Sequence, residues 1–79
     1  MSVTIRYYAR LKEEAGLAQE TIETGAKTVE DLWSEVSARH GFTLEANLIK
    51  AAQADEFCPW DAPLVPGALL VFMPPVAGG

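Results

Sequence analysis

The sequence predicts a single α+β domain in which a mixed β-sheet packs against one main helix. Three observations lead to this fold class. Apolar and polar residues alternate at the start of the chain, a capped helical pattern occupies the middle, and an apolar run precedes two prolines near the end. With 79 residues, the chain has room for one such domain and not for two.

The chain begins with a predicted strand over residues 3–7. Val3, Ile5 and Tyr7 alternate with more polar residues, and this period of two is typical of a strand with one buried face. If the odd positions face the helix, Tyr8 faces outward and lies near the outward side chains of the last strand. An apolar patch of this kind on an acidic protein indicates a binding surface.

Two weaker patterns connect this strand to the main helix. Residues 9–15 have leucine and alanine four positions apart, which predicts one or two helical turns that Gly16 ends. Residues 19–24 are rich in threonine and glutamate, as expected of an edge strand that pairs back on the first one. Residues 25–27 then turn the chain.

The main helix is expected to begin after Thr28, a good N-cap residue. Asp31 stands three positions later, as in a capping box with the shorter acid. His40 suits the negative end of the helix dipole and is given no catalytic role, and Gly41 suits the left-handed residue that ends a helix. The apolar residues at helical spacing are Val29, Leu32, Trp33 and Val36.

The second half of the chain contains three shorter predicted strands. They cover residues 48–54, residues 57–58 and residues 68–73, with a turn at residues 60–64. Two strand pairs around one helix form a β-grasp arrangement. A ferredoxin-like split would use similar elements, but it needs a second long helix that the pattern lacks.

Composition excludes several classes of function. Six lysines and arginines against eleven aspartates and glutamates give a formal charge of −5, the wrong sign for binding nucleic acid or an anionic membrane. Cys58 is the only cysteine, so we expect no internal disulfide and no metal site. Neither a signal sequence nor an apolar run of roughly 20 residues is visible. We therefore expect a cytoplasmic protein.

The chain ends in a distinctive tail. Two prolines cannot extend the sheet, so residues 1–73 are expected to form the domain and residues 74–79 a projecting, flexible tail that reaches roughly 20 Å. Because two glycines lack side chains, the terminal carboxylate can enter a narrow channel in another protein and be activated there as an acyl adenylate. A frayed terminus without function is the alternative. The tail residues are Pro74, Pro75, Val76, Ala77, Gly78 and Gly79.

Three segments carry a resemblance to a known family. They read YYARLKEEAG at residues 7–16, TVEDL at residues 28–32 and FMPPVAGG at residues 72–79. On these segments the chain resembles the MoaD/ThiS family of ubiquitin-like sulfur carriers, and within it MoaD, the small subunit of molybdopterin synthase. The Pro-Pro-Val-Ala-Gly-Gly ending is the more specific match. The resemblance implies a ubiquitin-like β-grasp fold.

The resemblance also implies a function. On the family pattern, Gly79 is adenylated with ATP by a MoeB-like enzyme and converted to a thiocarboxylate. The tail then enters a MoaE-like large subunit and donates sulfur to cyclic pyranopterin monophosphate (precursor Z), in molybdenum cofactor biosynthesis. The two subunits form a heterotetramer in which the large subunit supplies the catalytic residues. The chain itself is then no enzyme and binds no cofactor.

The resemblance further indicates an interface with the large subunit. It implies four residues, and strand parity agrees for Tyr8 and Met73 and adds Val71 on the same outward face of the sheet. The aromatic residue at position 57 is equally well explained as part of the core. The expected interface residues are Tyr8, Lys12, Phe57, Val71 and Met73.

The chain departs from the family pattern in two places. Lys12 stands where arginine is common, and a point charge there gives less directional contacts than a guanidinium. The segment Gln-Ala-Asp-Glu at residues 53–56 replaces Val-Asn-x-Glu and loses an asparagine suited to a turn. Asp55 is expected to take over this turn role.

Three other functions stay open. The chain could carry sulfur for thiamine thiazole synthesis, although the opening aromatic pattern and the two prolines argue against it. It could also be a ubiquitin-like modifier that is conjugated to lysines. The third alternative belongs to another class: a non-catalytic β-grasp interaction module whose tail is idle.

Overall fold

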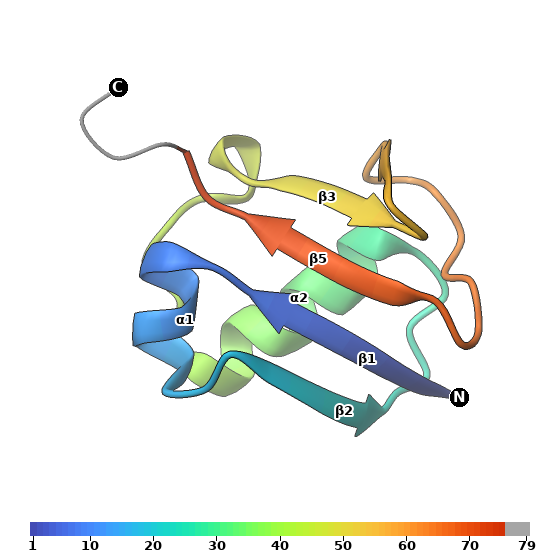
Figure 1. The fold of residues 1–79 in the computed structure, drawn as a ribbon, viewed down its shortest axis with the longest axis horizontal. Coiled ribbons are helices and arrows are strands. Elements are labelled where there is room, and N and C mark those ends of the chain that lie inside the picture. Colours follow the sequence, from blue (N-terminus) through green and yellow to red (C-terminus); the bar gives the residue numbers. More distant parts are fainter. Residues whose placement is uncertain (76–79) are drawn as a thin grey trace.

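The computed structural model describes residues 1–75, which form a mixed five-stranded sheet crossed by one long helix (Figure 1). Its elements are β1 (Ser2–Tyr7), α1 (Ala9–Ala15), β2 (Gln19–Glu23), α2 (Val29–His40), the 3₁₀ turn η1 (Ala46–Leu48), β3 (Lys50–Gln53), β4 (Glu56–Cys58) and β5 (Leu69–Met73). The sheet order is β2-β1-β5-β3-β4, with β1 and β5 parallel and the other neighbours antiparallel. The predicted β-grasp arrangement is confirmed.

The two ends of α2 follow the sequence prediction. The Asp31 backbone N–H donates to the Thr28 hydroxyl oxygen over 3.2 Å, which satisfies one of the free donors of the first turn. At the other end, Gly41 has a φ of 67° and donates its N–H to the Ser37 carbonyl. This left-handed conformation suits a residue without a side chain.

The core lies between α2 and the sheet. Inward side chains of β1 and β5 meet the apolar side of α2, while the outward side chains on both strands are half-buried or exposed. This alternation confirms the predicted strand parity. The residues that are most completely buried are Ile5, Tyr7, Leu11, Val29, Leu32, Val36, Leu70 and Phe72.

The structure corrects the start of the predicted third strand. Residues 46–48 form a 3₁₀ turn, so the strand begins at Lys50 rather than at Leu48. The turn closes with hydrogen bonds from the N–H groups of Leu48 and Ile49 to carbonyls three residues earlier. It buries Ile49 in the core and leaves Leu48 exposed beside the tail.

The same strand also ends earlier than predicted. Ala54 and Asp55 have φ of 52° and 67°, and the pair forms the two-residue hairpin turn between Gln53 and Glu56. Two consecutive left-handed residues cannot continue a strand. Asp55 therefore has the turn role that the sequence predicts.

Two other strands are one residue shorter than predicted. β5 begins after Ala68, because the Ala68 N–H is bonded to the Val65 carbonyl of the preceding turn. β2 ends before Thr24, whose side chain is buried and donates a hydrogen bond of 2.5 Å to Glu35 on α2.

No helix among residues 1–75 is long and apolar enough to cross a membrane.

A polar cluster beneath β1 and β2 was not predicted. The Tyr7 hydroxyl donates to Glu20 Oε2 over 2.6 Å, and His40 Nε2 lies 2.6 Å from the same oxygen. Burial raises the pKa of the Glu20 carboxyl, but hydrogen bonds from Tyr7 and His40, together with the charges of His40 and Arg39, outweigh it and hold this pKa below its usual value. The cluster joins β1, β2 and the end of α2.

Candidate functional site

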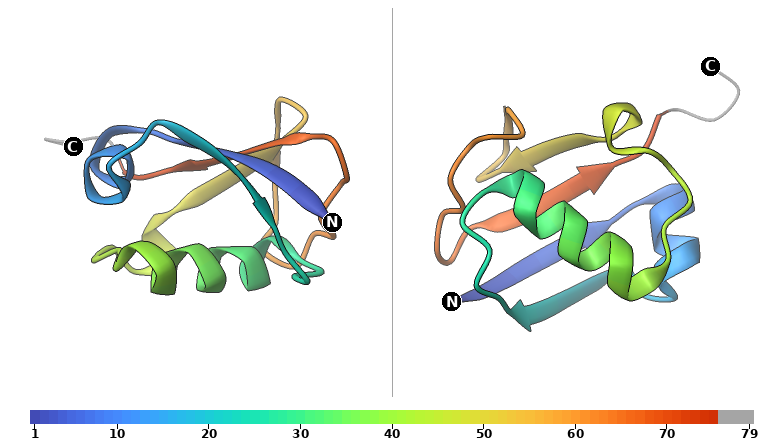
Figure 2. Two further views of the ribbon diagram at one scale, coloured as in Figure 1. Left: turned by 90° about the horizontal axis from the view of Figure 1, so that it is seen from below. Right: turned by 180° about the vertical axis from the view of Figure 1, so that it is seen from behind.

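The sheet has one covered face and one open face. Figure 2 shows α2 lying across one face and α1 at one end of the sheet, with no helix of residues 1–75 over the opposite face. One row of paired residues crosses this open face in the order Gln19, Arg6, Val71, Ala52 and Phe57. The row changes from polar to apolar between β1 and β5.

The polar half of the open face belongs to β1 and β2. Its side chains pair with one another across the two strands: Ser2 with Glu23 over 2.7 Å, Thr4 with Thr21 over 2.8 Å, and the Arg6 guanidinium with Gln19 over 3.0 and 3.2 Å. Each of these side chains therefore has a hydrogen-bond partner within the domain.

The apolar half belongs to β5, β3 and β4. Phe57 is 73% exposed and Tyr8 is 45% exposed, and both flank the half-buried outward side chains of β5. The exposure of Phe57 excludes the core interpretation of this residue. The apolar half consists of Tyr8, Ala52, Phe57, Leu69, Val71 and Met73.

Two grooves run beside Phe57 and Met73, which line both of them. The strand groove, of about 260 Å³, lies over β5 and reaches Asp55 at the hairpin turn. The tail groove, of about 310 Å³, is formed by Leu48, Lys50, Phe57, Met73, Pro74 and Pro75. Hollows of this size can accept single side chains of a partner.

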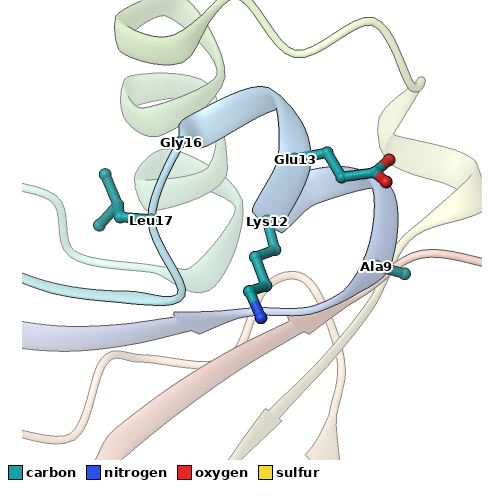
Figure 3. A pocket seen from close by; sticks show the side chains of 5 residues that line it. All are labelled: Ala9, Lys12, Glu13, Gly16 and Leu17. Atoms are coloured by element: carbon teal, nitrogen blue, oxygen red, sulfur yellow. The ribbon is translucent and has the colours of Figure 1, made fainter.

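Lys12 is not brought to either groove. It lies on α1 and lines a separate shallow hollow with Ala9, Glu13, Gly16 and Leu17. Figure 3 shows the Lys12 and Glu13 side chains pointing in different directions from this short helix. The structure therefore gathers four of the five predicted interface residues on one surface and leaves the fifth on a neighbouring one.

Sequence reasoning missed other residues of this surface. Leu69 could have been found, because it has the same parity as Val71 on β5. Lys50 could not, because its position opposite Met73 depends on the register between β3 and β5. The sequence pattern predicts a strand at Leu48, whereas Leu48 lies exposed on η1.

The tail begins at the end of β5, beside the tail groove. Pro74 is half-buried and Pro75 is exposed. β5 is the central strand, and the chain leaves it at the end of the sheet where α1 lies (Figure 1). The other predicted tail residues, Val76, Ala77, Gly78 and Gly79, lie outside the described residues.

Among residues 1–75, no three His, Cys, Asp or Glu side chains gather to hold a metal ion.

Comparison with known protein families shows to which family this chain belongs. Residues 5–79 match the model of the ThiS family. The chain belongs to the ThiS family. It is thus a member of the ubiquitin-like sulfur carriers and modifiers, and the family assignment agrees with the resemblance seen in the sequence. A search of curated protein sequences gives no match.

Several solved structures resemble this ThiS-family chain. A putative molybdopterin converting factor subunit 1 from Pyrococcus furiosus is 30% identical, with a TM-score of 0.79 and coverage of 96% of this chain and 99% of that one. SAMP1 from Haloferax volcanii is 23% identical over the whole of both chains, with a TM-score of 0.81. Subunits 1 and 2 of the Helicobacter pylori molybdopterin-converting factor form a complex in which the similar chain is 21% identical, with a TM-score of 0.69 and full coverage of both chains. The last two show likeness of fold.

Proposed function

We propose that this chain is the sulfur-carrier small subunit of a cytoplasmic molybdopterin synthase. The observation that carries the proposal is the origin of the tail at the end of central β5, directly beside the uncovered apolar half. A partner that binds the apolar half is well situated to receive the tail in its own active site. The carrier then supplies reach and position, and the partner supplies catalysis.

The chemistry takes place at the carboxylate of Gly79. In a MoeB-like enzyme, a carboxylate oxygen attacks the α-phosphorus of ATP and releases pyrophosphate, which gives an acyl adenylate. Hydrosulfide then attacks the acyl carbon, the bond to the phosphate oxygen breaks, and AMP leaves, which gives the thiocarboxylate. In the large subunit, the thiocarboxylate sulfur forms a bond to a side-chain carbon of cyclic pyranopterin monophosphate while a carbon–oxygen bond at that carbon breaks and its oxygen group leaves. Water then hydrolyses the acyl–sulfur bond and restores the carboxylate. Two such transfers supply the dithiolene of molybdopterin.

Gly78 and Gly79 suit this chemistry because a chain without side chains passes through a narrow channel. Pro74 and Pro75 stiffen the base of the tail and hold it apart from the sheet ladder. In this proposal, Tyr8, Phe57, Val71 and Met73 contact the large subunit, and Lys12 contacts it from the neighbouring surface on α1.

The comparisons support a partner subunit of this kind. The Pyrococcus furiosus relative is described as subunit 1 of a molybdopterin converting factor, and the Helicobacter pylori structure holds subunits 1 and 2 together. We propose a MoaE-like large subunit in a heterotetramer and a MoeB-like adenylating enzyme as the two partners.

A second function has an observation in its favour. The chain has the fold of SAMP1, which is a small archaeal modifier protein. A modifier uses the same adenylated C-terminus, but a lysine amine displaces AMP and forms an isopeptide bond. The two functions therefore share activation and differ in the nucleophile that follows.

Intact-protein mass spectrometry tests the proposal. The full chain is incubated with ATP, the adenylating enzyme and a sulfur source, and we expect one terminal oxygen to be replaced by sulfur at Gly79. A chain lacking Gly78 and Gly79 serves as the control and must stay unmodified. If an adenylating enzyme that is active on another carrier adds no sulfur to this chain, the carrier function is wrong. Adducts on lysines of other proteins in place of sulfur would favour the modifier.

A further inference from the structure

A positive and a negative side chain lie at opposite ends of the apolar half. Lys50 is the single charged residue lining the tail groove, and Asp55 is the single charged residue lining the strand groove. Lys50 pairs with Met73 at the end of β5 from which the tail leaves. Asp55 lies beyond Gln53, which pairs with Leu70 near the start of β5. The two charges thus mark opposite ends of one apolar surface.

Both charges are held on rigid backbone. Lys50 is the first residue of β3, which is paired on both sides by β5 and β4. Asp55 is fixed in a two-residue hairpin turn. Neither side chain makes an ion pair or a side-chain hydrogen bond with another residue of the range 1–75. In contrast, Arg10 and Arg39 pair with Glu14 and Glu35.

The two charges are too far apart to neutralise one another. Gln53 is three residue steps along β3 from Lys50, which corresponds to about 10 Å along the strand before the turn to Asp55. This distance exceeds the screening length of about 8 Å at physiological ionic strength. Each charge is therefore available to a different group of a partner.

The other charged residues on this face, Arg6 and Glu23, have partners within the domain. Glu23 accepts a hydrogen bond from the Ser2 hydroxyl. Arg6 lies in the polar half, where two of its guanidinium nitrogens donate to Gln19. Between Lys50 and Asp55, the surface is formed by Phe57, Met73 and their apolar neighbours. A surface with a cation at one end, an anion at the other and apolar side chains between them favours one direction of a partner over the reverse.

We propose that Lys50 and Asp55 set the direction in which the large subunit lies across the apolar half. The large subunit places a carboxylate against Lys50, beside the tail, and a lysine or arginine against Asp55, at the hairpin. Apolar side chains of the large subunit fill the grooves between these two contacts. This inference rests on the proposed function, because it takes the large subunit as the occupant. If the large subunit binds in this direction, the tail leaves the domain next to one end of the large subunit.

The test measures binding of the full chain to the molybdopterin synthase large subunit of the same organism. The deciding variant combines Lys50→Asp with Asp55→Lys, which keeps the net charge of −5 and reverses the direction. We expect binding to fall by about tenfold or more, because like charges then face each other at both ends. Equal binding by this variant and the unaltered chain would overturn the inference.

Two single variants keep the test open if the double variant fails to fold. Lys50→Glu is expected to weaken binding about tenfold, and Asp55→Asn, which tolerates the left-handed turn, about two- to fivefold. Lys27→Glu and Asp61→Asn make the same changes in net charge at exposed positions outside both grooves, and they are expected to leave binding within about twofold. Equal losses in the variants and in these controls would mean that net charge, and not direction, matters.

The inference and the proposed function fail in different ways. If the unaltered chain does not bind the large subunit, the proposed function is wrong and the inference falls with it. If the chain binds and gains sulfur at Gly79 while the charge-reversed variant binds equally well, only the direction set by Lys50 and Asp55 is wrong.

Discussion

The two halves of the open face are built from strands of one sheet, yet they use their outward side chains differently. In the polar half, β1 and β2 pair serine, threonine, arginine and glutamine with one another. In the apolar half, β5, β3 and β4 expose aromatic and aliphatic groups that nothing in residues 1–75 covers. Side chains that are satisfied within the domain stabilise it, whereas unsatisfied apolar surface is available for a partner. On the open face, therefore, side chains that pair within the domain and side chains available for binding lie on different strands.

The largest effect is expected from a charge in the apolar half. Met73→Lys places an ammonium group where a partner would bury a thioether, so binding to the large subunit should fall by more than about tenfold. Titration calorimetry measures the affinity, and thermal unfolding checks that the domain still folds. Thr4→Lys in the polar half is the matched control and should change affinity by less than about twofold. An unfolded Met73→Lys chain would contradict the assigned strand parity.

The next largest effect concerns stability beneath the polar half. Glu20→Gln weakens the contacts with Tyr7 and His40, and the free energy of unfolding should fall by about 1–3 kcal/mol at neutral pH. Denaturant unfolding measures this change. Affinity for the large subunit should stay the same, because Glu20 is remote from both grooves. If Glu20→Gln weakened binding without lowering stability, the separation between a polar half that stabilises the domain and an apolar half that binds the partner would be wrong.

The contribution of Glu20 also has a predictable pH dependence. Its pKa is lower in the folded chain than in the unfolded one, so the stabilisation is present above the unfolded value of about 4.5 and is lost as the pH falls through the folded value. The difference in unfolding free energy between Glu20→Gln and the unaltered chain should therefore shrink below this range. A difference that is constant from pH 7 to pH 3 would contradict the assigned shift.

A smaller effect is expected at the most exposed aromatic residue. Phe57→Ala removes a ring that is mostly in water, so the free energy of unfolding should change by less than about 0.5 kcal/mol. Binding to the large subunit should weaken by about 1–2 kcal/mol, since exposed aromatic residues commonly anchor interfaces. Surface plasmon resonance and denaturant unfolding on the same variant measure both quantities. A large loss of stability would show that Phe57 serves the fold.

The smallest effect is expected at the hairpin turn that borders the apolar half. Ala54 has a φ of 52°, a conformation that alanine rarely adopts. Ala54→Asn should raise the free energy of unfolding by about 0.5–1 kcal/mol, because asparagine tolerates this conformation and favours such turns. Thermal unfolding measures the gain, and affinity should not change. Ala52→Asn, in the neighbouring strand, should give no such gain.

Local patterns in the sequence predicted most of the fold and part of the site. The alternation of Val3, Ile5 and Tyr7 and the caps Thr28 and Gly41 act within a few residues, so a local pattern contains them. Outward positions such as Tyr8 and Met73 follow from the same alternation. These features required no knowledge of which strands are neighbours.

The remaining features depend on residues that are distant in the sequence. Tyr7, Glu20 and His40 come from three elements, and only the closed fold brings them to one oxygen. Lys50 reaches the tail groove through its register with Met73, and Lys12 is separated from that groove by the position of α1. Register and helix placement are tertiary properties, which a local pattern does not specify.

The central position of β5 has a mechanical consequence. β5 is joined on one side to β1 by a parallel ladder and on the other to β3 by an antiparallel ladder. A pull on the tail, when a partner draws it inward, acts along the strand and loads both ladders in shear at once. An edge strand under the same force would be held by one ladder only. Two ladders therefore resist a pull on the tail, so the force does not easily detach β5 from the sheet.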